Sequence, residues 1–341
     1  MEQQTRLVKG KTFEREEGDS VEFKEITSSK PVKKIANHAE EYTTGFLNAQ
    51  IEGDLYLGIN DDGIIVGVTL NRTDKDSLQR DIPNKLKSTD PPLLYSYYKI
   101  TIHNVFNLNI EPIENLYVIQ IHTIKPNKEH FPYRTSTGSV YFKKGSSCPK
   151  LNSEEITQEH RRRTLIHLQK EANKIDKELE ENTNNINLLK KRAEIAKYMS
   201  DVDTLDRTYK KILELEPKDS KVRIQYATAH ESIGDLEGAL SILDDALQSV
   251  TDKSSILQSK GSMFVNSDNW NKALNLYQEA LELSPDDYTI ITQIGILFRQ
   301  LGEYKKSIQF LNYALSKSPN YRVAKYEKKK TYYEIFKGGI H

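Results

Sequence analysis

The amino-acid sequence predicts two modules, an α+β domain over residues 10–150 and an all-α solenoid of helical hairpins after it. The first module mixes alternating and apolar segments with one amphipathic helix, whereas the second repeats a pattern of small and apolar residues at a step of 34 residues. A chain of 341 residues is also longer than one ordinary core needs. The predicted divisions are the domain at 10–150, a helical linker at 151–185, repeats at 186–320 and a capping helix at 321–341.

Composition restricts the classes of function. Lys plus Arg and Asp plus Glu both number 49, and residues 1–150 alone hold 20 of each sign. Because coating of nucleic acid by bulk attraction needs a basic surplus, any nucleic-acid site here must be a local patch. Cys148 is the single cysteine, which excludes an intrachain disulfide and a cysteine-rich zinc site. We find neither a signal-like start nor a run of 18 apolar residues, so we expect a cytoplasmic protein without a membrane partner.

The N-terminal elements follow from periodicity. Val21–Lys24 alternates apolar and polar residues as a half-buried strand does, and 31–48 predicts a helix that begins with Pro31. The turn Asn60-Asp61-Asp62-Gly63 separates two apolar segments, 55–59 and 64–68, which predicts a hairpin. Further strands are predicted at 97–103, 116–124 and 139–143. Residues 152–183 have helix-forming, charge-rich composition and predict a connecting helix, most simply a solvated one.

The solenoid is predicted from residues that recur after 34 positions. The recurring pairs include Gly261 and Gly295, Ala246 and Ala280, and Pro285 and Pro319. Small residues permit two helices to cross closely, and proline ends the second helix of each hairpin because it lacks an amide donor. The pattern resembles the tetratricopeptide repeat, with three clear units and a degenerate one over 193–217. The resemblance implies an array that recruits a protein partner on its concave face.

Four stretches of the first module resemble, in the same order, the AlbA-like (divergent AAA) domain of the Schlafen family. They are Glu17–Lys24, Phe46–Gln50, Gly53–Gly67 and Val140–Ser147. Nuclease members of that family cleave structured RNA, such as transfer or ribosomal RNA, with three carboxylates and a divalent metal. The positions that match these carboxylates are Glu17, Glu22 and Asp61. The resemblance therefore implies a metal-dependent endoribonuclease in which these residues are catalytic and bind Mg²⁺ or Mn²⁺.

The repulsion between neighbouring carboxylates is consistent with a metal site and sets a requirement that the structure must meet. Two carboxylates about 5 Å apart repel by roughly 3 kcal/mol at an effective dielectric of 20. Three acids that meet therefore require a cation or a shared proton, and a hard cation also activates water for phosphodiester cleavage. Acids of this kind are equally typical of a solvent-facing strand and a turn. The nuclease hypothesis thus requires the three side chains to surround a metal ion, and a basic side chain between them would contradict it.

Basic residues near the predicted site are candidates for a track that binds RNA phosphates. They are Lys24, which shares a strand face with Glu22, together with Lys33, Lys34, Lys143 and Lys144, and also Arg161–Arg163. Each patch alone is equally typical of solvated surface. Animal Schlafen cores contain two such lobes, so the resemblance implies a homodimer or pairing with a second Schlafen-like lobe. The alternative to a nuclease is a non-catalytic adaptor, with a nucleic-acid-binding or scaffold lobe beside a protein-binding array.

Overall fold

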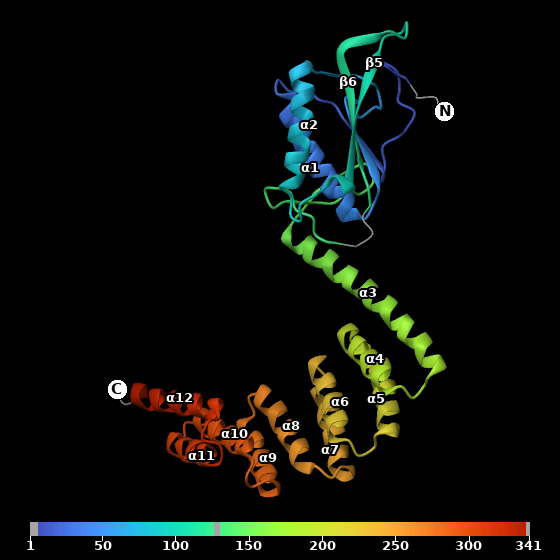
Figure 1. The fold of residues 1–341 in the computed structure, drawn as a ribbon. Coiled ribbons are helices and arrows are strands. Elements are labelled where there is room, and N and C mark those ends of the chain that lie inside the picture. The colour runs from blue at the N-terminus through green and yellow to red at the C-terminus, as the bar shows by residue number, and fades with distance from the viewer. Residues whose placement is uncertain (1–5, 126–129, 339–341) are drawn as a thin grey trace. The chain divides into compact units, whose positions relative to one another are not determined.

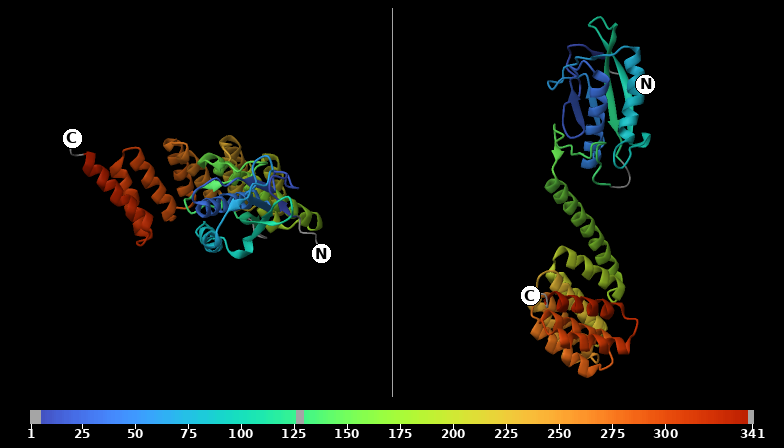
Figure 2. Two further views of the ribbon diagram at one scale, coloured as in Figure 1. Left: turned by 90° about the horizontal axis from the view of Figure 1, so that it is seen from above. Right: turned by 90° about the vertical axis from the view of Figure 1, so that its left-hand side faces the viewer.

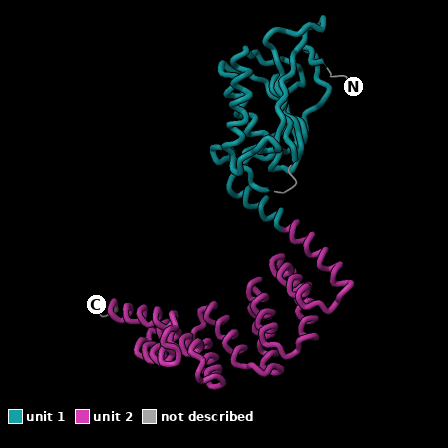
Figure 3. Tube along the Cα trace, in the orientation of Figure 1, with its two compact units in different colours: residues 1–164 teal, residues 165–341 magenta. Residues whose placement is uncertain are grey.

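A computed structural model describes residues 6–125 and 130–338 of the chain. The chain divides into two compact units, Met1–Thr164 and Leu165–His341 (Figure 3). The division falls inside one long helix, α3 (Ser153–Glu181), rather than in an extended linker. The predicted α+β module followed by an all-α array is therefore the observed fold class.

The N-terminal unit contains a six-stranded mixed sheet. Its strands are β1 (Leu7–Val8), β2 (Val21–Lys24), β3 (Gly53–Leu57), β4 (Val68–Thr69), β5 (Tyr98–Phe106) and β6 (Pro112–Thr123). The order is β1-β5-β6-β3-β2, with β4 paired to β6. β2 runs parallel to β3 and β1 runs parallel to β5, while β6 is antiparallel to its neighbours. A separate ribbon pairs β7 (Val140–Tyr141) with β8 (Lys150–Leu151).

Both faces of the sheet are packed. Helices α1 (Pro31–Ala49) and α2 (Arg72–Lys87) lie against one face (Figures 1 and 2), where Leu55 and Leu57 of β3 join their core. Tyr56 points to the other face and packs with Phe23, as expected from the two-residue period of a strand. Glu22 and Lys24 alternate with Phe23 along β2, so both are directed toward the face that carries α1.

The structure corrects one sequence prediction in this unit and adds one helix that was not predicted. Residues 64–68 do not form one regular strand, since they contribute an isolated bridge between Ile59 and Ile65 and then the short β4. Gly67, at φ 76°, turns the chain where a side chain would meet Leu116. Helix α2 was not predicted, because its sequence is polar and contains Pro83. A capping box between Asn71 and Asp74 begins it.

The C-terminal unit is built from consecutive helical hairpins. After α3 come α4 (Ile186–Met199), α5 (Val202–Leu215), α6 (Ser220–Ser232), α7 (Leu236–Ser249), α8 (Lys253–Asn266), α9 (Trp270–Leu283), α10 (Tyr288–Gln300), α11 (Tyr304–Lys317) and α12 (Arg322–Gly338). The small residues lie where helices meet, since a side-chain carbon on Gly261 would approach the Tyr277 ring to 3.0 Å. Ala273 and Ala280 are fully buried. The recurring small residues therefore mark the positions where two helices cross closely.

Candidate nucleic-acid site

The three predicted acids lie on separate segments that converge beside β2. A tight turn, in which the Gly18 amide bonds the Val21 carbonyl, returns Glu17 to the strand, where its Oε1 accepts the Phe23 amide at 2.6 Å. Glu22 lies within β2. Asp61 occupies the hairpin turn that follows β3, and β3 pairs in register with β2. We call Glu17, Glu22 and Asp61 the carboxylate cluster.

Glu22 is the buried centre of this cluster, with only 1% of the residue exposed. Its Oε1 lies 2.7 Å from the Lys24 ammonium, and its Oε2 lies 2.7 Å from the Lys143 ammonium. The Tyr42 hydroxyl of α1 is also hydrogen-bonded to Glu22, and burial followed by the Glu22 charge raises the pKa of that phenol. Both carboxylate oxygens of Glu22 are therefore engaged by cationic side chains of the protein itself.

The other two acids are near enough to Glu22 to influence each other. Partial burial raises the pKa of the Glu17 carboxyl, and the charges of Glu22 and Asp61 raise it further, whereas the Phe23 amide and Lys24 act in the opposite direction. Asp61 is 85% exposed, and its Oδ1 lies 3.7 Å from the Lys24 ammonium. Lys24 therefore lies between Glu22 and Asp61 as their shared counter-ion.

This arrangement does not fit a divalent cation as it stands. Three carboxylates have the oxygen chemistry that Mg²⁺ or Mn²⁺ prefers. The Lys24 ammonium nevertheless occupies the position between two of them, and a cation would have to displace it. Across the described part of the chain, no group of three or more His, Cys, Asp or Glu side chains is placed to hold a metal ion. The three carboxylates converge, but two lysines balance part of their negative charge.

The predicted lysines differ in how exposed they are and in what they contact. Lys143 is not a phosphate contact, because its side chain is 0% exposed and its ammonium binds Glu22 and the Gly145 carbonyl. Lys24 is one-quarter exposed and engaged with the cluster. Lys33, Lys34 and Lys144 are exposed, as a phosphate-binding role requires. Sequence reasoning missed the burial of Lys143 because the pairing partner is 121 residues away.

A cleft of about 380 Å³ runs along the first turns of α1. We call it the lysine cleft. It is lined by Ser28, Ser29, Lys30, Lys33, Lys34, Asn37, His38 and Glu41. The His38 ring lies 6.0 Å from the Tyr42 ring, and the Lys24 ammonium lies 5.6 Å from the same ring. The cleft therefore adjoins the carboxylate cluster through Tyr42. Lys30 and His38 were not predicted, although their spacing of four residues from Lys34 places them on one helix face.

Of the three predicted arginines of α3, Arg162 and Arg163 have partners within the unit, and Arg161 is exposed. Arg162 and Arg163 both bind Glu159, and the Arg163 guanidinium lies 4.4 Å from the centre of the Phe131 ring. Arg163 also donates a hydrogen bond to the Asn48 carbonyl at the end of α1. These contacts leave Arg163 14% exposed, so its predicted role in binding phosphate is corrected.

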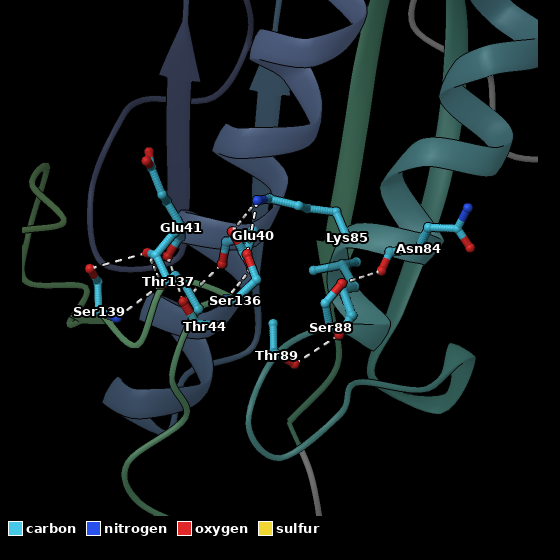
Figure 4. Close-up of polar contacts among 12 residues, drawn as sticks. Glu40, Glu41, Thr44, Asn84, Lys85, Ser88, Thr89, Ser136, Thr137 and Ser139 are labelled. Carbon is cyan, nitrogen blue, oxygen red and sulfur yellow. Dashed lines mark hydrogen bonds and ion pairs between the residues drawn. The ribbon is translucent and has the colours of Figure 1, made fainter.

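A buried ion pair fixes α1, and with it one wall of the lysine cleft. Figure 4 shows Glu40 directed toward Lys85 of α2, whereas Glu41 extends away from this pair. The Glu40 carboxylate lies 3.2 Å from the Lys85 ammonium and accepts the Ser136 amide at 2.5 Å. The Lys85 ammonium also donates to the Ser136 hydroxyl. These contacts hold together α1, α2 and the loop that contains Ser136, which are far apart in sequence.

A second polar cluster lies on the opposite face of the sheet. Asp54 accepts hydrogen bonds from Arg15 at 2.5 Å and Gln120 at 2.8 Å, and lies 2.9 Å from His122 Nδ1. Burial alone would raise the pKa of Asp54, but these three partners outweigh it and hold the pKa below its usual value. Asp54 is therefore a satisfied structural carboxylate, and no sequence signal distinguished it.

The fold and this site define a nucleic-acid-related α+β domain joined to a helical array for protein interactions. Residues 17–152 match the family model described as "Schlafen, AlbA_2". Residues 256–287 match the tetratricopeptide repeat. No described helix is both long and apolar enough to cross a membrane.

Several solved structures are similar to the array. YrrB, a "TPR protein with an unusual peptide-binding site", is 16% identical over 49% of this chain and 86% of its own, with a TM-score of 0.36. The human IFIT1 dimer with m7Gppp-AAAA is 17% identical over 49% of this chain, with a TM-score of 0.36, and the match spans 42% of the IFIT1 chain. MamA is 20% identical over 43% of this chain and 80% of its own, with a TM-score of 0.35.

Proposed function

We propose that this protein is an RNA-binding adaptor, in which the N-terminal unit binds RNA along the lysine cleft and the helical array recruits a protein. The observation that carries the proposal is the cleft itself. Three lysines, two serines, an asparagine, a histidine and a single glutamate line this cleft at the start of α1, so its charged groups are mostly basic. Lysines position phosphates by charge, and hydroxyl and amide groups add hydrogen bonds to the same backbone. The balanced net charge is consistent with this reading, because the basic groups are local.

The second half of the proposal concerns the protein partner. A groove of about 770 Å³ is lined by residues of α3, α4 and α5 that carry both signs of charge, including Asp176, Arg192, Asp206, Arg207 and Lys211. Mixed charge of this kind favours a charged, extended peptide over an apolar helix. Recruitment through the array would leave the lysine cleft available for RNA.

Replacing both Lys33 and Lys34 with glutamate is expected to weaken binding of transfer RNA and to lower the salt dependence. Loss of two phosphate contacts should reduce the slope of log affinity against log salt by about two. Fluorescence polarisation of labelled transfer RNA at several salt concentrations measures both effects. The matched control is Lys9→Glu with Lys11→Glu, two exposed lysines of the same unit outside the cleft. Equal affinity of the two double variants would reject the cleft as the RNA site.

A metal-dependent endoribonuclease is the second candidate, and the convergence of Glu17, Glu22 and Asp61 favours it. In that case Lys24 must leave Glu22 and Asp61 before a cation binds. The adaptor needs no such rearrangement, because both oxygens of Glu22 already have cationic partners. The cluster has three carboxylates and two lysines, so its formal charge is −1. An RNA phosphate would therefore be repelled from it unless a cation were present.

Asp61→Asn separates the two candidates without disturbing the fold, because this side chain is 85% exposed. If the protein is a nuclease, the wild type cleaves transfer RNA with Mn²⁺, and the variant is slower by about a hundredfold or more. Asp62→Asn, its exposed neighbour, is the matched control and should cleave normally. If the wild type does not cleave transfer RNA and Mn²⁺ does not raise the melting temperature of the N-terminal unit, the nuclease is rejected and the adaptor is retained.

A further inference from the structure

The last described helix, α12, has one face that packs on the array and uses its acids there. Ala324 and Thr331 are fully buried on this face. The only two acids of α12, Glu327 and Glu334, both bind the Arg299 guanidinium of α10 at 3.0 Å. The Arg299 side chain is 4% exposed. Both negative charges of α12 are therefore paired with Arg299 inside the C-terminal unit.

The outward face of α12 is basic and aromatic except for Val323. Its exposed residues are Arg322, Val323, Lys325, Tyr326, Lys329, Lys330, Tyr332, Tyr333, Phe336 and Lys337. At 100° per residue, they fill an arc of roughly half the helix circumference, in which no acid lies. We call this arc the outward face. Tyr326, Tyr333 and Phe336 are 64%, 65% and 72% exposed, values unusual for such large rings.

The alternation of rings and cations identifies the chemistry of the partner. Positive charge on a helix whose two acids are already paired with Arg299 is complementary to a polyanion, and exposed aromatic rings offer flat surfaces on which bases stack. The Lys328 ammonium, at the edge of this face, lies 6.0 Å from the Tyr332 ring. An interfacial membrane helix would instead separate a continuous apolar face from a basic one. Here lysines and rings share the same arc.

We propose that the outward face of α12 binds single-stranded nucleic acid, with bases stacked on Tyr326, Tyr333 and Phe336 and phosphates on the lysines. This site lies in the C-terminal unit and is additional to the lysine cleft. It does not depend on the proposed function of the N-terminal unit. A single strand fits better than a duplex, because only an unpaired base has both ring faces open to stacking.

The test uses the full chain in a Lys33→Glu, Lys34→Glu background, which removes the lysine cleft. Fluorescence polarisation with a labelled uridine-rich RNA of about 12 nucleotides, within the usual range for such sites, measures affinity. The combined variant Tyr326→Ala, Tyr333→Ala, Phe336→Ala should bind about tenfold to a hundredfold more weakly. Tyr198→Ala removes a ring that is 60% exposed elsewhere in the same unit, and should bind normally.

Ultraviolet crosslinking followed by peptide mass spectrometry locates the contact directly, and crosslinks within residues 322–337 are expected. Absence of crosslinks there, or unchanged affinity of the triple variant, would overturn the proposal. Binding to vesicles of phosphatidylserine and phosphatidylcholine tests the alternative that the outward face contacts a membrane. If the triple variant loses vesicle binding while its RNA affinity is unchanged, the face is a membrane surface and the proposal is wrong. Unfolding followed by Trp270 fluorescence verifies that the variants retain the array.

Discussion

Replacing Glu22 with leucine is expected to destabilise the N-terminal unit by about 3–5 kcal/mol. The substitution removes the counter-ion of the Lys143 ammonium, which is 0% exposed and keeps only the Gly145 carbonyl and the face of the Phe46 ring. A buried charge that loses its counter-ion retains the full cost of its desolvation. Hydrogen exchange of the β2 and β3 amides measures the change, since these strands pair directly beside the substitution.

The double variant Glu22→Leu, Lys143→Met provides the control for this prediction. Removing both charges leaves two apolar side chains of similar volume, so most of the lost stability should return. Trp270, the single tryptophan, lies in the C-terminal unit and should unfold at the same denaturant concentration in all variants. If Glu22→Leu costs less than about 1 kcal/mol, the value of a surface pair, the pair is solvated and our account of the cluster is wrong.

This expected instability also decides how catalysis should be tested. A variant of Glu22 that fails to cleave RNA would be ambiguous, because the domain itself would be weakened. Asp61 and Glu17 are better positions, since the first is exposed and the second is partly exposed. The three carboxylates thus differ in their value as mutation sites, and only the structure distinguishes them.

The fold was largely predictable because its signals are local. The proline at the start of α1 and the strand alternation in Val21–Lys24 involve residues that are close in sequence, and the repeat is read directly as a fixed step of 34 residues. Helix α2 was missed because its internal proline and polar composition oppose the helix locally. Its three buried residues, Leu78, Ile82 and Leu86, secure it by packing on the sheet, which is a long-range effect.

The three acids of the carboxylate cluster were predicted from the sequence, but their pairing with lysines was not. The resemblance to the Schlafen family supplied the three acids, and the structure brings them together. Neither spacing nor composition indicated that Lys143 would be buried against Glu22, or that Lys24 would lie between Glu22 and Asp61. Glu22 and Lys143 are 121 residues apart, so their pairing depends on tertiary structure. The lysine cleft was missed for a different reason, since its lining residues are close in sequence but its concave shape depends on how the loop before α1 folds.

Replacing Arg299 with methionine is expected to destabilise the end of the array by about 3 kcal/mol, near the lower limit for a buried pair because both glutamates retain some contact with water. The variant leaves Glu327 and Glu334 side by side without a cation. Amide exchange in α12 should accelerate, and unfolding followed by Trp270 should shift to lower urea. Arg322→Met, which removes an exposed arginine of α12, should change stability by less than about 0.5 kcal/mol.

Arg299 also connects stability with the charge of the outward face. While it binds Glu327 and Glu334, the free charges of α12 are all positive. Once it is removed, two carboxylates become available to the lysines of the same helix, which should weaken RNA binding even where α12 stays helical. Combining Arg299→Met with Glu327→Gln and Glu334→Gln should restore affinity more fully than stability, because the amides remove the negative charge without restoring the ion pairs. Equal recovery of both quantities would mean that Arg299 acts on RNA only through folding.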